Sequence, residues 1–509
     1  MTRSAAEIGA GLLPARPARP IETGSRLHVI GAAGAGASAA ALLAHHAGAS
    51  VSGCDAGGES PYTPALAQAG IPLAWRHSAE HLGDSAPGGR PQRLAVTKAL
   101  TSVAADHPEL VAARRAGIPL EPWQQLVADA AATRSSRLVA VAGTHGKSTT
   151  SGWLVDLLVR AGRDPSAFVG ALLPAAVTGG EPATARWGGG DAFVVEADEY
   201  AGNFDAYRPE VAVLLNVEWD HPDVFADQAE VEEAFVRWLR DAAVDGRSVM
   251  LVANVDDPGV VAVCRKLAGW PGRIVAVGTG AAGQSVGDAA LQARVISRDE
   301  AGTALRVIRP SGSDLELHVS LPGDHNVANA LAVVGAAYCL AADDQAVRDS
   351  LASFGGVGRR LELKGEVAGV TVLDDYGHHP TAIARTIAGV RQRYPARALW
   401  AVYEPLTYHR TAAMLDEFAA VLADHADRVV IADIWAGRDP DTTLTSSEAL
   451  AAAVTRRGGA AATASGSVEQ TADYLADHVR AGDVVLVMGG GRSYVIAERL
   501  LRLLAGEAR

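Results

Sequence analysis

The chain has 509 residues, of which 49% are hydrophobic and 20% charged, and its formal net charge at pH 7 is −13. This length predicts two or three domains, and the composition is that of a globular protein rather than a disordered one. The negative charge argues against nucleic acid or anionic membranes as partners, because either requires a basic face.

Three cysteines, Cys54, Cys264 and Cys339, lie far apart in apolar surroundings, which predicts no disulfide framework and a reducing compartment. No stretch reaches the length of a membrane-spanning helix, so we expect no membrane insertion. Residues 1–24 contain three prolines and no apolar core of a signal peptide, and we expect a flexible extension there. A cytoplasmic protein is the expectation that follows.

A first nucleotide-binding pattern opens the predicted N-terminal domain, residues 25–134. Leu27–Ile30 is a predicted strand that runs into the glycine-rich turn Gly31–Ser38 and a helix to Ala47, and the next strand, Val51–Gly53, ends near Asp55. An acid about twenty residues after such a turn is where a ribose-binding carboxylate lies. A tight turn that merely packs closely is an equally good interpretation.

A second pattern predicts a phosphate-binding loop. The apolar run Leu138–Ala142 precedes GTHGKSTT, and a helical pattern follows from Ser151. Backbone N–H groups of such a loop and of the helix start point at one place, where the helix dipole favours negative charge. The loop residues expected to hold phosphate are Gly143, Thr144, His145, Gly146, Lys147, Ser148 and Thr149. The alternative is a capped helix start without a ligand.

Carboxylates follow two further predicted strands. Phe193–Val195 leads into the acidic run Glu196–Glu199, and Val211–Leu215 leads into a segment that ends at His221. Carboxyl ends of neighbouring strands meet at one edge of a doubly wound sheet, so these groups should lie beside the phosphate loop. The set is suited to holding Mg²⁺ against a triphosphate, and ATP is the predicted ligand.

The remaining chain predicts two more domains, residues 135–355 and 356–509, with a first linker at Ala132–Arg137 and a second at Phe354–Arg360. After the second linker, predicted strands alternate with helical stretches at Val370–Leu373, Leu399–Tyr403, Val429–Ala432 and Val484–Met488. The predicted fold class is therefore α/β, with three domains in series.

Several motifs occur in a fixed order and together resemble the Mur ligase family. They are GTHGKSTT at 143, EADE at 196, NVEWDHPDVF at 216, PGDHNVANA at 322, GRRLE at 358, DDYGHHPT at 374 and YEPLTYHRT at 403. The resemblance implies a Rossmann-like N-terminal domain that binds a UDP-sugar, a P-loop ATPase-type central domain and a Rossmann-like C-terminal domain. It also implies ATP and Mg²⁺, with UDP-N-acetylmuramate and an amino acid, L-alanine first, joined through an acyl phosphate in peptidoglycan biosynthesis.

The same resemblance implies roles for particular residues. The implied groups are Ser148, Glu196 and His221 for Mg²⁺; Lys147, His378 and Arg410 for catalysis; His325, Asn326 and Arg359 for ATP; and Gly34, Gly36, Ser38, Asp55, Tyr376 and His379 for substrate. Some of them have a structural alternative: a capped helix start at Asn326, a solvated arginine at 359 or 360, and a capped polar turn before Pro380.

Some positions depart from the pattern of the ligases that add alanine. Ala33 and Ala39 replace glycines, Glu404 replaces a glutamine, and Leu406 replaces a histidine near the incoming amino acid. Two alternatives follow: a recycling ligase that attaches a tripeptide to the same UDP-sugar, and a diverged, non-catalytic paralogue that only binds nucleotide or UDP-sugar. We expect a monomer or a homodimer.

Overall fold

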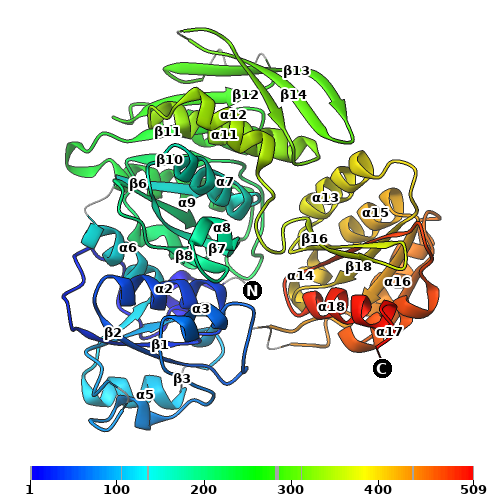
Figure 1. Cartoon of the computed structure of the whole chain (residues 1–509). Helices are drawn as coiled ribbons and strands as arrows, with labels where there is room; N and C mark the ends of the chain where they lie inside the picture. Colours follow the sequence, from blue (N-terminus) through cyan, green and yellow to red (C-terminus); the bar gives the residue numbers. More distant parts are fainter. Residues whose placement is uncertain are drawn as a thin grey trace.

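The structure is a computed structural model that describes residues 3–86, 88–104, 106–134, 137–280, 286–310, 312–437, 439 and 441–507. The described residues form three α/β units that follow one another along the chain (Figure 1). The predicted three-domain α/β fold is confirmed. The predicted linker Ala132–Arg137 lies partly outside the described residues. Among the described helices, none combines the length and apolar character that crossing a membrane requires.

The first unit is a parallel sheet with the strand order β3-β2-β1-β4-β5. Its strands are β1 (Arg26–Ile30), β2 (Ser50–Cys54), β3 (Leu73–Ala74), β4 (Arg93–Val96) and β5 (Leu120–Pro122). Its helices are α2 (Ala35–His46), α3 (Thr63–Gln68), η1 (Ala79–Leu82), α4 (Lys98–Thr101), α5 (Pro108–Ala116) and α6 (Trp123–Arg134). The glycine-rich turn joins β1 to α2 at the carboxyl edge of the sheet, as the sequence predicts.

The segment before β1 is packed against the rest of the protein, so the prediction of a flexible extension is wrong for residues 3–24. Helix α1 (Ala5–Ile8) buries Ile8 beside Tyr200 of the second unit. Arg16 forms ion pairs with Glu121 at 3.0 Å and Asp129 at 2.7 Å, and both carboxylates are buried. Those buried charges require cations, and Arg16 of the proline-rich segment provides one beside Arg93 of β4, which pairs with the same two carboxylates.

The second unit is a mixed sheet with the order β15-β14-β13-β12-β11-β10-β6-β9-β7-β8. Its strands are β6 (Arg137–Ala142), β7 (Ser166–Leu173), β8 (Ala183–Arg186), β9 (Ala192–Ala197), β10 (Val211–Leu214), β11 (Met250–Asn254), β12 (Arg273–Gly278), β13 (Ala289–Asp299), β14 (Gly302–Ile308) and β15 (Leu315–Val319). Its helices are α7 (Lys147–Arg160), α8 (Ala175–Thr178), η2 (Tyr200–Ala206), α9 (Gln228–Ala242), η3 (Val244–Gly246), α10 (Pro258–Lys266), α11 (Asp324–Cys339) and α12 (Asp344–Ser353). Strand β6 lies between β9 and β10 and is parallel to both, so the phosphate loop and both carboxylate segments emerge at one edge.

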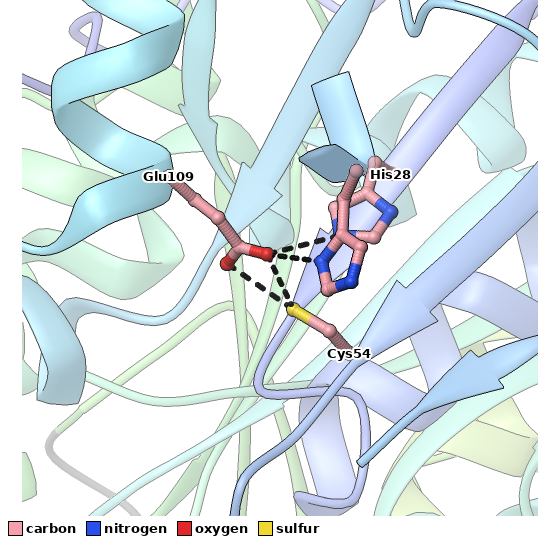
Figure 2. A group of neighbouring side chains, drawn as sticks. His28, Cys54 and Glu109 are labelled. Atoms are coloured by element: carbon pink, nitrogen blue, oxygen red, sulfur yellow. Dashed lines mark hydrogen bonds and ion pairs between the residues drawn. The ribbon is translucent and has the colours of Figure 1, made fainter. Parts of the chain in front are cut away.

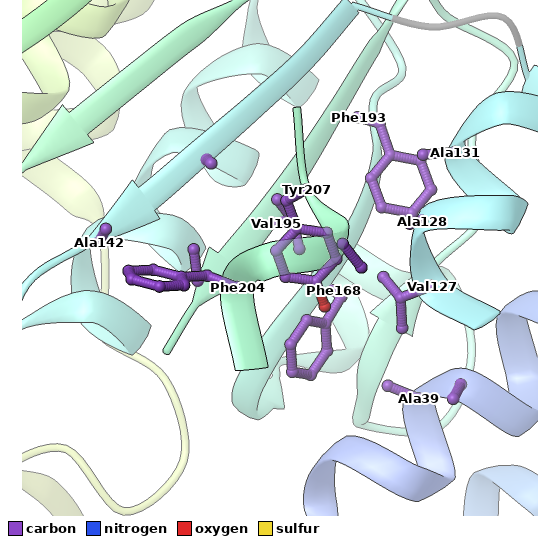
Figure 3. Close-up of a cluster of buried hydrophobic side chains, with 14 of the residues drawn as sticks. Ala39, Val127, Ala128, Ala131, Ala142, Phe168, Phe193, Val195, Phe204 and Tyr207 are labelled. Carbon is purple, nitrogen blue, oxygen red and sulfur yellow. The ribbon is translucent and has the colours of Figure 1, made fainter. Parts of the chain in front are cut away.

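The first two units share a continuous hydrophobic core. Figure 3 shows Ala39 of α2 and Val127 of α6 beside Phe168 of β7 and other residues of the central sheet. The Trp123 and Phe168 rings meet edge to face with centroids 5.2 Å apart. Because the apolar residues of both units are buried together, separating them would expose that core to water.

The third unit is a sheet with the order β16-β17-β21-β18-β19-β20, parallel except for its first strand. Its strands are β16 (Glu362–Val367), β17 (Val370–Asp375), β18 (Leu399–Glu404), β19 (Arg428–Ala432), β20 (Ala462–Gly466) and β21 (Val484–Gly489). Its helices are α13 (Pro380–Arg393), α14 (Tyr408–Ala413), α15 (Leu415–His425), α16 (Ser447–Arg456), α17 (Val468–His478) and α18 (Ser493–Leu504). Separate apolar clusters cover its two faces, so this unit has a core of its own.

Candidate active site

One cavity of about 1120 Å³ lies where the three units meet. The first unit contributes Gly36 and Asp55 to its lining, the second Lys147 and His221, and the third Arg410. The carboxyl edges of the parallel strands face this space, which is where α/β sheets bind ligands.

The phosphate loop is held in one conformation by its neighbours. Gly143 and Gly146 have φ angles of +139° and +82°. A side chain at Gly146 would place its Cβ 2.5 Å from Oδ1 of Asn329 and would have to adopt a left-handed φ, so a larger residue would be strained and would displace the Asn329 amide. The Asn216 amide accepts from the His145 N–H at 2.7 Å and donates to the His145 carbonyl at 3.0 Å. The loop therefore presents the N-terminus of α7 to the cavity, as an anion site requires.

Lys147 is the first residue of α7, and its ammonium is surrounded by oxygen. It donates to the Gly143 carbonyl at 2.6 Å and to Glu199 at 3.2 Å, and it lies 3.7 Å from Asp198. Burial alone would lower the pKa of Lys147, but the neighbouring carboxylates outweigh burial and raise it. The side chain is therefore charged at neutral pH and positioned at the phosphate loop.

Oxygen donors for a divalent cation lie next to Lys147. Ser148 Oγ donates to Glu196 at 3.0 Å, and the other Glu196 oxygen accepts from the Gly170 N–H at 2.6 Å. His221 has a φ of +56°, a conformation that is strained for a residue with a side chain, and its Nε2 lies 3.8 Å from Glu199. The hydroxyl and carboxylates fit Mg²⁺, which prefers oxygen ligands. The structure thus brings Ser148 and Glu196 into contact and places His221 beside Glu199.

His325 and Asn326 lie in the first turn of α11 at the cavity wall. Burial, together with the charge of Arg385, lowers the pKa of His325 to about 4, so its ring is neutral. Nδ1 of His325 has no hydrogen-bond partner among the described residues. The Asn326 amide donates to the Pro322 carbonyl at 2.8 Å and therefore takes part in the helix start. His325 has a ring nitrogen left for a ligand, whereas Asn326 is partly used by the backbone.

The structure corrects the choice between the two arginines of the linker. Arg359 is turned into the third unit, where it pairs with Asp374 at 3.2 Å and donates to the Gly489 carbonyl at 2.7 Å. Arg360 instead lines the cavity and donates to Ser148 Oγ at 3.1 Å. Arg359 has a φ of +57°, which turns consecutive side chains in directions that the motif alone cannot predict. Arg360, not Arg359, is at the phosphate loop.

His378 and Arg410 bring the third unit to the central site. His378 Nδ1 lies 3.0 Å from the Tyr376 carbonyl, a contact that requires Nδ1 to carry the proton and leaves Nε2 as an acceptor. Burial lowers the pKa of His378 well below its ordinary value. Arg410 donates to Asp220 at 2.6 Å and lies 3.4 Å from the Nδ1 atom of His221. The third unit therefore brings a neutral proton acceptor, His378, and a buried cation, Arg410, to the site.

Tyr376 and His379 flank this pair. The guanidinium of Arg360 lies 4.9 Å from the centroid of the Tyr376 ring, and both side chains line the cavity. His379 is the N-cap of α13 and accepts from the Thr381 N–H at 3.3 Å, as the capped-turn alternative predicts. Its ring packs at 4.6 Å against His145 of the phosphate loop.

The glycine-rich turn contributes to the cavity in part. Asp55 accepts from the Ala33 N–H at 3.1 Å, which fixes the turn, and still lines the cavity. Gly34 caps α2, and a Cβ at Gly36 would lie 2.2 Å from the Trp123 ring. Ser38, expected at the substrate, is not among the residues that line the cavity: it is fully buried and its hydroxyl lies 3.1 Å from that of Thr184 in β8. Ser38 joins two units because α2 packs its face against β8 rather than toward the cavity.

Several residues of the site could not be assigned from their type alone. Asn216 and Asp220 lie in the NVEWDHP motif. The motif marks both as candidate site residues, but it does not show that Asn216 holds the phosphate loop or that Asp220 pairs with Arg410. Asn329 touches the loop from α11, far along the chain; it lies in the PGDHNVANA motif, but that motif does not show that its side chain meets Gly146.

Models of the Mur ligase family match three consecutive parts of the chain. The Mur ligase family catalytic domain matches residues 26–135, the middle domain residues 141–337 and the glutamate ligase domain residues 359–491. The chain belongs to the Mur ligase family.

Within the family, the chain is 39% identical to a UDP-N-acetylmuramate–L-alanine ligase of Kineococcus radiotolerans, over 94% of this chain and 96% of that protein. A crystal structure of a UDP-N-acetylmuramate–alanine ligase of Thermotoga maritima has the same fold, with a TM-score of 0.75, 23% identity, and coverage of 95% of this chain and 100% of that one. A murein peptide ligase from Psychrobacter arcticus gives a TM-score of 0.70 at 25% identity and covers 96% of this chain and 100% of its own.

Proposed function

We propose that this protein is an ATP-dependent ligase that joins L-alanine to the lactyl carboxylate of UDP-N-acetylmuramate, in peptidoglycan biosynthesis. The observation that carries the proposal is the convergence of phosphate-loop, acidic and histidine groups from separate units on one cavity. The near full-length similarity to a ligase of this specificity supports it. We infer that the reaction takes place in the cytoplasm, where ATP is available.

The chemistry follows from the positions of the charges. A carboxylate is a poor acceptor for an amine, so phosphoryl transfer from ATP must first convert it to an acyl phosphate. Lys147 and Arg360 lie at the phosphate loop and would stabilise the charge of the moving phosphoryl group. Ser148, Glu196 and His221 would hold Mg²⁺, which supplies charge neutralisation there when bound. Asp55 and the glycine turn would face the UDP-sugar.

The amine must lose a proton before it attacks. His378 is neutral and buried, with Nε2 as its acceptor atom, and Arg410 lies close enough to Asp220 and His221 to face the same substrate groups. His378 is therefore the residue that we propose as the proton acceptor, with Arg410 stabilising the negative charge of the acyl phosphate.

The two departures near the amino acid have different consequences. The Glu404 carboxylate is buried, which raises its pKa to about 6, although the backbone N–H groups of Arg492 and Ser493 act in the opposite direction. It faces the start of α18. Leu406 lines the cavity and pairs with Trp435 in an isolated bridge. An apolar wall of this kind suits a small apolar side chain such as the methyl group of alanine.

The test is phosphate release with ATP, Mg²⁺ and UDP-N-acetylmuramate, adding L-alanine, other amino acids or the tripeptide L-alanyl-γ-D-glutamyl-meso-diaminopimelate separately, with product mass measured in each case. Alanine-dependent release and the matching mass gain are expected, and release only with the tripeptide would show a recycling ligase instead. Lys147→Met should abolish the product while Lys266→Met, which removes a partly exposed lysine from an ion pair with Glu232, should leave it unchanged. The proposal is refuted if the wild type and the Lys266→Met control both fail to release phosphate with every acceptor tried.

A further inference from the structure

A second cluster of chemically reactive side chains lies in the first unit. Glu109, in α5, is fully buried, and Figure 2 shows its carboxylate directed at Cys54 and at an imidazole beside His28. Cys54 Sγ lies 3.3 and 3.2 Å from the two carboxylate oxygens, and His28 Nε2 lies 3.9 Å from Oε1. Nδ1 of His81 also contacts Oε1. The phosphate-loop chemistry uses none of these groups.

The carboxylate of Glu109 is buried among histidines, without a permanently charged partner among its described contacts. A fully buried carboxylate is strongly unfavourable without a cation or a full set of hydrogen bonds. Its contacts among the described residues are histidines, the Cys54 thiol and the Ser78 N–H at 3.2 Å, without a lysine or an arginine. A proton, held by a histidine or by the carboxyl group itself, or a metal ion can neutralise the charge.

Unpartnered histidine nitrogens favour the metal. His28 is 2% exposed, and its Nε2, directed at Glu109, has no hydrogen-bond partner among the described residues. The other ring nitrogen, Nδ1, lies 2.9 Å from Ser52 Oγ. A histidine that ligates a metal through one nitrogen and donates from the other to an oxygen has this arrangement.

We propose that His28, Cys54, His81 and Glu109 bind one Zn²⁺ ion. One donor atom from each of the four lies within 4.8 Å of all the others. A tetrahedral ion with bonds of about 2.0–2.3 Å separates its ligands by about 3.3–3.8 Å, close to the separations of Cys54 Sγ and of His28 Nε2 from the Glu109 carboxylate. His81 lies closer to Glu109 than two ligands of one ion can, so its ring has to move when the ion binds. Imidazole and thiolate with a single carboxylate are donors that select zinc over Mg²⁺ or Ca²⁺. On binding, the Cys54 thiol loses its proton to solvent, and the thiolate and carboxylate charges balance the ion.

The ion would connect segments of the first unit that are far apart in sequence. His28 lies on β1, Cys54 ends β2, His81 belongs to η1 and Glu109 to α5. His77 approaches from the cavity side, with Nδ1 3.3 Å from Cys54 Sγ and 3.4 Å from Glu109 Oε2. His77 also lines the large cavity, so the zinc would stabilise the part of the cavity wall that His77 forms in the proposed UDP-sugar site.

The experiment is elemental analysis of the full chain, produced without a metal-binding tag and passed through gel filtration after equilibration with Zn²⁺. We expect about one zinc per chain, a content that Cys54→Ser and His81→Asn both reduce several-fold, with circular dichroism to show that each variant is folded. Cys264→Ser is the matched control, because Cys264 is a buried cysteine of the second unit and should leave the zinc content unchanged.

Cobalt provides a measurement that does not depend on the variants folding. Co²⁺ added to the wild type and to Cys264→Ser should produce a thiolate-to-cobalt charge-transfer absorption, which added Zn²⁺ removes. Absence of both retained zinc and this absorption would overturn the proposal and leave a histidine–Glu109 ion pair as the explanation. Zinc that persists unchanged in both folded site variants would equally overturn it.

Discussion

The contact between Arg410 and Asp220 offers a sharp test of how the third unit is held. Arg410 belongs to α14 and Asp220 to the loop after β10, and their side chains are 4% and 5% exposed at 2.6 Å. Burial opposes both charges, yet the pKa of Asp220 is lowered well below its ordinary value by Arg410 and nearby histidines. The Arg410→Met variant leaves Asp220 buried and charged without its partner.

Removal of one member of a buried ion pair costs about 3–5 kcal/mol. Because this pair joins two units that have separate cores, the cost should fall on their association rather than on the unfolding of either unit. An association constant lower by about two to four powers of ten is therefore expected. Small-angle scattering should show an expanded chain, and limited proteolysis should cleave faster near the linker at 354–360.

The matched control is Arg306→Met. Arg306 pairs with Glu316 across β14 and β15 at 2.6 Å, but the side chains are 51% and 64% exposed. The expected loss of stabilising free energy on removing this pair is therefore below about 1 kcal/mol. The double variant Arg410→Met, Asp220→Leu should regain compactness because no unpaired charge is left. The reasoning is refuted if Arg410→Met is as compact and as protease-resistant as Arg306→Met.

Three further predictions concern the phosphate loop, the contact between the second and third units, and the contact between the first and second units. Gly146→Ala should lower ATP affinity, measured by calorimetry, because it combines about 1–2 kcal/mol of backbone strain with a clash against Asn329. The control Gly162→Ala introduces the same backbone strain, at a φ of +67°, without a neighbouring atom to clash with. Equal effects of the two substitutions on ATP affinity would contradict the clash. Burial raises the pKa of Glu218, but His145, Thr381 and Arg385 outweigh it and lower the pKa to about 2. The contribution of Glu218 to association of the third unit should therefore be complete above its unfolded pKa of about 4.3 and be lost as pH falls towards 2, and a pH profile of compactness unchanged by Glu218→Gln would contradict this. Ser38→Ala should lower unfolding stability by about 1 kcal/mol without changing KM for UDP-N-acetylmuramate, and a large rise in KM would return the hydroxyl to the substrate site.

Local patterns were sufficient for the elements that carry the site. The apolar run before Gly143 became β6, and the glycines and Lys147 became the loop and the start of α7. The predicted strands of the third unit are present as well, for example Val370–Leu373 within β17. Periodicity and turn residues act over a few positions, so the sequence reveals them directly.

Side-chain direction and long-range pairing needed the tertiary structure. Arg359 and Arg360 are neighbours in sequence, but a positive φ sends one into the third unit and the other to Ser148. Ser38 lies in the expected motif, yet the packing of α2 on β8 directs it into an interface.

The sequence by itself determined the order of the three units, the phosphate loop and the family, because these depend on local spacing. The tertiary structure alone decided that Arg410 meets Asp220 and that His28, Cys54, His81 and Glu109 surround one point. Each of these groups comes from a different element, and no spacing along the chain records which elements will be neighbours. Burial then changes the energetics of these groups, because a carboxylate that water stabilises at the surface needs a cation or hydrogen bonds to be stable inside the fold.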